Sequence, residues 1–163
     1  MTTEPRRFAN FESAFATAFL EEIGGEAYFS ALSRAEPDPR RAALWARLAL
    51  VERRTTAALR PVAATLGLTP ADETAAWRSG ADEAAGLHGL PWGEAMSGMV
   101  RDYPAYLDEF AALKAAAPTP AAASAAQILI DHEAAIIDMA RAELAGDPDP
   151  CRPLDLYLDR LPG

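Results

Sequence analysis

The sequence predicts an all-α protein built around four long helices. The 163 residues are rich in alanine, leucine and glutamate, which favour helices, whereas runs of valine, isoleucine and threonine are short. Clusters of proline and glycine separate the long segments, and no segment shows the alternating pattern of a strand. The length is that of one domain, 1–163, large enough to bury a core.

The helices are expected at about 8–34, 40–66, 91–116 and 120–145. In "AEPDPRR" (35–41), Asp38 can cap the second helix, with Pro39 at its first position. Thr119 and Pro120 repeat this arrangement in "APTP" (117–120). Pro61 and Pro104 lie inside the second and third helices, so we expect a kink or an early end at each.

The lengths of the connections predict how the helices pair. Short turns join the first helix to the second and the third to the fourth, so each pair should form an antiparallel hairpin. The segment 67–90 is long enough to cross a bundle and should carry a short helix near 71–85. In the tail, 146–163, "GDPDPCRP" closes the fourth helix and "LDLYLDRL" predicts one further helical turn.

Composition excludes several classes of partner. The formal charge of −9 and the pI near 4.7 argue against nucleic acid and anionic membranes, whose binding requires clustered basic residues. No apolar run approaches the roughly 18 residues needed to span a bilayer. The start, "RRFANFESAFATAFL", resembles a signal peptide, but Asn10 and Glu12 interrupt it, so we expect a cytoplasmic protein. The single cysteine, Cys151, excludes an internal disulfide and a cysteine-rich metal site.

The sequence "DHE" at 131–133 holds one of two histidines in the chain. On a helical wheel, Glu133 falls in the middle of the apolar face of the fourth helix, and His132 falls at its border. Asp131 points away, so the inward residue of "DHE" is the glutamate. The apolar face comprises Leu129, Ile136, Ala140 and Leu144. The other histidine, His88, is expected in a solvated loop.

The first and second helices also carry acids within their apolar faces. Glu22 and Glu26 lie one turn apart around Gly24-Gly25, and Glu52 lies three residues before Thr55. The third helix offers no central carboxylate, and Lys114 near its end is the one inward base. The apolar faces of these three helices comprise Phe8, Phe11, Phe15, Phe19 and Phe29; Leu44, Leu48, Leu59, Val62 and Leu66; and Met96, Met99, Tyr103, Leu107 and Phe110.

Four inward glutamates predict a polar core. An uncompensated buried carboxylate costs several kcal/mol, so such a cluster needs a cation, shared protons, a basic partner or water. Alternatively, one or two of the acids lie near helix ends and reach solvent. Gly24-Gly25 permits the close approach of a neighbouring helix, which we favour, or widens a ligand pocket. The predicted cluster is Glu22, Glu26, Glu52 and Glu133, with Tyr103 and Thr55 beside it.

This pattern resembles the ferritin-like superfamily, the rubrerythrin and ferritin group of di-iron four-helix bundles, over about 8–145. The resemblance implies two antiparallel hairpins joined by the long crossover. It also implies metal-ligating glutamates at Glu22 or Glu26, at Glu52 and at Glu133. Glu22 and Glu52 are 30 residues apart, as are Tyr103 and Glu133, which fits a twofold repeat. Another four-helix arrangement, such as a haem-oxygenase-like bundle, is the alternative.

The sequence departs from the family at its ligand motif. Thr55 and Ile136 stand where the motif histidines would be, and Tyr103 stands where a glutamate would be. A metal site would therefore be oxygen-rich, suited to Fe or Mn, with His132 as a peripheral ligand. These departures favour a bundle with a vestigial metal site that now binds a small molecule or a protein partner. The alternative is an atypical di-metal oxidoreductase, or metal-binding protein, acting on O₂ or peroxide.

We also expect a homodimer. The aromatic residues of the first helix spread over more of its circumference than one core contact requires, and an exposed remainder would favour association. They are Phe8, Phe11, Phe15, Phe19, Tyr28 and Phe29.

Overall fold

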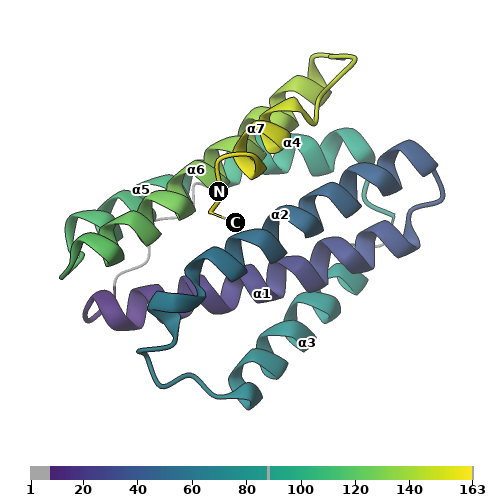
Figure 1. Ribbon diagram of the computed structural model, residues 1–163. Coiled ribbons are helices and arrows are strands. Elements are labelled where there is room, and N and C mark those ends of the chain that lie inside the picture. Colours follow the sequence, from purple (N-terminus) through teal and green to yellow (C-terminus); the bar gives the residue numbers. More distant parts are fainter. Residues whose placement is uncertain (1–7, 88, 163) are drawn as a thin grey trace. The chain divides into compact units, whose positions relative to one another are not determined.

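The computed structural model describes residues 8–87 and 89–162, and every regular element within these ranges is helical (Figure 1). The all-α prediction is therefore confirmed for the described residues. The chain forms two compact units. The first comprises residues 16–89, and the second comprises residues 1–15 together with 90–163.

The first unit is built on an antiparallel hairpin of α1 (Phe11–Ala35) and α2 (Pro39–Ala63). Residues near the end of α1 contact residues near the start of α2, and residues near the start of α1 contact residues near the end of α2. Ser33 Oγ donates a hydrogen bond to the carbonyl oxygen of Ala42 over 2.9 Å. The rings of Phe29 and Trp45 stack with centroids 5.8 Å apart. Arg60 lies 4.8 Å over the ring of Phe19, so the predicted first hairpin is confirmed.

The third helix of this unit, α3 (Pro70–Gly86), lies in the segment predicted to hold a short helix. Thr69 and Asp72 form a capping box at its start, with each side chain bonded to the other residue's backbone N–H. Arg60 forms an ion pair with Glu73 and so links α2 to α3. The three helices therefore run up, down and up within the unit.

Local chemistry sets the helix ends. Asp38 accepts a hydrogen bond from Arg41 N at the start of α2, over 2.9 Å, as predicted. Asn10 accepts one from Ser13 N over 2.8 Å, so α1 begins at Phe11 and Phe8 precedes the helix. Phe8 is 36% exposed, and its predicted place in the apolar face is therefore wrong.

The second unit contains α4 (Trp92–Asp102), α5 (Pro104–Ala115), α6 (Pro120–Leu144) and α7 (Arg152–Leu158). Trp92 Nε1 donates to Glu143 Oε1 over 2.8 Å, and Lys114 Nζ donates to Gln127 Oε1 over 2.6 Å. Both α4 and α5 therefore lie antiparallel to α6, and the second predicted hairpin is confirmed. Thr119 caps α6 by accepting from Ala122 N over 3.1 Å.

The two internal prolines have different effects. The predicted third helix is divided into α4 and α5 at Tyr103, directly before Pro104, which has no N–H to donate to the preceding turn. By contrast, α2 continues past Pro61 to Ala63, short of the predicted end at residue 66. A helix therefore ends directly before Pro104, whereas α2 ends two residues after Pro61.

The C-terminal helix α7 packs against α6 (Figure 1). Its side chains Leu154 and Tyr157 are buried. Between the two helices, Gly146 has φ of +73°, the left-handed conformation that glycine adopts most readily after a helix. The tail therefore contains the predicted extra helical turn, and α7 covers part of α6.

Most of the predicted core is confirmed, with corrections near the helix ends. Leu144 is 47% exposed at the last residue of α6. Lys114 is exposed and bonded to Gln127, so it is not an inward base. Val62, Leu66, Tyr103 and Leu107 are half-buried. The buried members of the predicted faces are Phe11, Phe15, Phe19, Phe29, Leu44, Leu48, Leu59, Met96, Met99, Phe110, Leu129, Ile136 and Ala140.

The burial of the α1 phenylalanines also bears on association. Phe11, Phe15, Phe19 and Phe29 are all buried within one chain. Only Phe8 and the half-buried Tyr28 remain of the expected exposed aromatic surface. The homodimer stays a prediction, resting on less surface than the sequence suggested. Across the described residues, no helix combines the length and apolarity needed to span a bilayer.

Candidate metal centre

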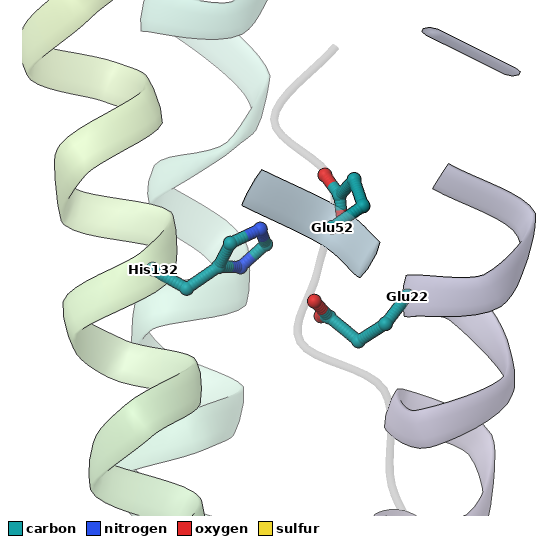
Figure 2. A group of neighbouring side chains, drawn as sticks. All are labelled: Glu22, Glu52 and His132. Carbon is teal, nitrogen blue, oxygen red and sulfur yellow. The ribbon is translucent and has the colours of Figure 1, made fainter. Parts of the chain in front are cut away.

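Two buried glutamates face each other inside the first unit. Glu22 on α1 and Glu52 on α2 are each 4% exposed, and their side chains are hydrogen-bonded to each other. Figure 2 shows the two side chains reaching from their helices. The helical wheel predicted both residues to face inward, and the antiparallel hairpin brings them to the same level. The structure thus joins two of the four predicted glutamates directly.

The glycine pair on α1 has two distinct roles. A Cβ on Gly80 of α3 would lie 1.9 Å from the carbonyl oxygen of Gly24, so α3 crosses α1 closely there. A Cβ on Gly25 would lie 2.8 Å from Cδ of Glu52, so Gly25 leaves space for that carboxyl group. Close approach of a neighbouring helix is therefore confirmed at Gly24, whereas a ligand pocket at the glycine pair stays a prediction.

The pKa of Glu52 is strongly shifted. Burial raises the pKa of Glu52 to about 8, although its hydrogen bond with Glu22 lowers that pKa and the charge of Glu26 raises it. At neutral pH Glu52 is therefore largely protonated. The hydrogen bond between the two carboxyl groups is consistent with a shared proton.

Glu26 occupies the border of this group. It is half-buried and lies 3.8 Å from the Nε atom of Arg53, which is itself largely exposed. Burial raises the pKa of Glu26, and the positive charge of Arg53 opposes that rise. The third predicted glutamate is therefore near Glu52 but has a basic partner at the surface.

Thr55 and Tyr103 both make contacts within one helical turn of their own positions. Thr55 is buried one turn after Glu52, and its hydroxyl donates to the carbonyl oxygen of Val51 over 2.9 Å. Tyr103 lies at the break between α4 and α5, edge-on to the ring of Tyr106 with centroids 5.9 Å apart. The placement of both beside a single cluster remains a prediction.

His132 is more deeply buried than the sequence predicted. It is 3% exposed on α6, as deeply buried as Glu133, which is 5% exposed. Its Nδ1 atom lies 4.0 Å from Glu133 Oε2, and its ring lies 6.0 Å from that of Tyr157 on α7. The border position assigned to it is therefore wrong, because a wheel drawn for α6 alone omits the cover supplied by α7. His88 lies outside the described residues.

Glu22 and Glu52 could serve as carboxylate ligands of a metal ion. Carboxylate oxygens suit divalent ions such as Mn²⁺ and Fe²⁺. Coordination by Glu26, Glu133 or His132 stays a prediction.

Fold and group together define a helical protein with buried carboxylate and imidazole side chains. The chain matches no protein-family model, no curated protein and no solved structure. The ferritin-like resemblance therefore remains a prediction.

Proposed function

We propose that this protein binds one divalent metal ion, Fe²⁺ or Mn²⁺, through Glu22 and Glu52 of the α1–α2 hairpin. The observation that carries the proposal is the hydrogen-bonded pair of buried carboxyl groups on α1 and α2. Two carboxylates that meet away from water need either a shared proton or a cation. A divalent ion would neutralise both charges at once.

The choice of metal follows from the donor atoms. Carboxylates favour Mn²⁺ and similar hard ions. The oxygen donors support Mn²⁺ or Fe²⁺. Two protein ligands would leave coordination positions for water or a small substrate such as O₂ or peroxide, which supports the oxidoreductase alternative.

In a second candidate function, the protein acts without a bound metal ion. It is favoured by the same hydrogen bond, because one proton held between the two carboxyl groups can satisfy both without any ion. In that case the site is vestigial, and the protein binds a small molecule or a protein partner. The two candidates differ in whether a cation displaces the shared proton.

The test is elemental analysis of protein purified from cells supplied with iron and manganese. We expect about one metal equivalent in the wild type, and affinity at least about tenfold lower in Glu22→Gln and Glu52→Gln. Glu21→Gln is the matched control, because Glu21 is the exposed neighbour of Glu22 on α1 and should bind metal as the wild type does.

The contrary result is equally clear. A wild-type protein that is purified without metal, and whose melting temperature does not change with added Fe²⁺ or Mn²⁺, contradicts metal binding. It would favour the metal-free candidate.

A further inference from the structure

We infer that Gly25 is a positioning residue for Glu52, because its missing side chain holds open the space that the Glu52 carboxyl group occupies. A Cβ at this position would lie 2.8 Å from Cδ, 2.9 Å from Oε2 and 3.2 Å from Cγ of Glu52. The first two distances are shorter than a Cβ atom tolerates. This inference rests on the proposed function and adds a residue that has no ligand atom of its own.

Other helical glycines lack this relationship. The nearest atom to a Cβ on Gly24 is the backbone oxygen of Ala76, 3.3 Å away, so Gly24 serves the approach of α3. On α4, the nearest atom to a Cβ on Gly98 is Arg101 Nη2, 3.7 Å away, in ordinary contact. Only at Gly25, among the described glycines, would an added Cβ lie closer than 3.0 Å to a side chain.

Glycine at residue 25 lowers the stability of α1. A glycine within a helix costs about 1 kcal/mol relative to alanine, because it loses more backbone freedom on folding. The space for Glu52 is the compensating feature that the geometry supplies. Without it, the carboxyl group could not lie where it meets Glu22.

A methyl group at residue 25 would move the carboxyl group rather than the helices. The clashing atoms belong to the flexible end of the Glu52 side chain, which can shift while the backbones of α1 and α2 stay in place. Ordinary contact begins near 3.4 Å, so Cδ must move by more than about half an ångström. That displacement exceeds the tolerance of a metal-ligand set.

The experiment measures Mn²⁺ affinity by calorimetry for the wild type, Gly25→Ala and Gly98→Ala. We expect Gly25→Ala to weaken binding at least about tenfold, whereas Gly98→Ala, the control for helix propensity, binds as the wild type does. A third variant, Gly25→Ala with Glu52→Asp, shortens the ligand by one methylene and should bind more tightly than Gly25→Ala alone. Wild-type affinity in Gly25→Ala would overturn the inference.

Metal-free thermal unfolding separates this inference from the proposed function. If the wild type binds no Mn²⁺, the proposed function fails, but the space at Gly25 can still be tested. We expect Gly25→Ala to lower the melting temperature relative to Gly98→Ala, and Glu52→Asp to recover part of that loss. A positioning role for Gly25 would be refuted if Gly25→Ala and Gly98→Ala lowered the melting temperature equally, and if Glu52→Asp had the same effect on melting temperature with and without Gly25→Ala.

Discussion

The side chains of Glu22 and Glu52 are hydrogen-bonded to each other inside the α1–α2 hairpin, although both residues are almost fully buried. Two helices that each present an apolar face to the core thus place their acids against one another. The pair must hold a proton or a cation, since two bare carboxylates would repel each other in a medium of low polarity. The predictions about pH and metal below follow from this choice.

Metal-free protein should lose stability as the pH rises. Glu52 binds its proton more tightly in the folded state, with a pKa of about 8, than in the unfolded state, where the ordinary value is 4.5. The folded state therefore binds more protons between these values, and the free energy of unfolding falls as pH increases through this window. The slope from this group is at most about 1.4 kcal/mol per pH unit. Urea unfolding with a chelator, from pH 5 to pH 9, measures it.

Glu52→Gln is the control for that slope. The amide is neutral at every pH, so the variant should lose the contribution of Glu52 while retaining that of other groups. The difference between wild type and variant should be flat below the unfolded pKa and change up to about pH 8. Parallel curves for the two proteins would show that Glu52 titrates normally.

Metal affinity should increase with pH. A metal ion must displace the proton of Glu52, so below a pKa of about 8 the apparent affinity should fall by about tenfold for each pH unit. Calorimetry in buffers of different ionisation enthalpy should detect about one proton released per ion bound at pH 7. Release of no proton would mean that the ion binds without Glu52.

Gly80→Ala should weaken the attachment of α3. The added Cβ would lie 1.9 Å from the carbonyl oxygen of Gly24, and backbone atoms cannot move aside as a side chain can. We expect a loss of about 1–3 kcal/mol in the free energy of unfolding, with faster amide exchange in α3. Gly86→Ala in the same helix is the control, because no atom lies within 4 Å of its Cβ. Similar losses in both variants would contradict a close crossing.

Arg53→Gln should affect titration more than stability. The Arg53 charge lowers the pKa of Glu26, so its removal should raise that pKa further, which NMR titration can measure. The free energy of unfolding should change by less than about 1 kcal/mol, because the Arg53 side chain is 61% exposed. An unchanged pKa of Glu26 would show that the pair does not persist in solution.

The sequence predicted features that depend on neighbouring residues in the chain. Asp38 and Thr119 cap α2 and α6 as expected, because capping is decided within one turn. The inward positions of Glu22 and Glu52 also followed from periodicity alone. The starts of α2 and α6 were thus predicted to within one residue.

Features that depend on a second helix could not be predicted in this way. The burial of His132 involves cover from Tyr157 on α7, which a wheel for α6 cannot include. The role of Gly25 depends on the Glu52 side chain of α2, so the sequence left two interpretations of the glycine pair open. Leu144 and Lys114 lie near helix ends, where an inward direction on a wheel no longer guarantees a neighbour.

The most direct measurement is a crystal structure of the protein soaked in Mn²⁺, with anomalous difference density recorded for the metal. We expect one strong peak bound by carboxylate oxygens of Glu22 and Glu52, and no such peak for Glu52→Gln. Density with no metal at these carboxyl groups, at a concentration that saturates other Mn²⁺ proteins, would contradict the account.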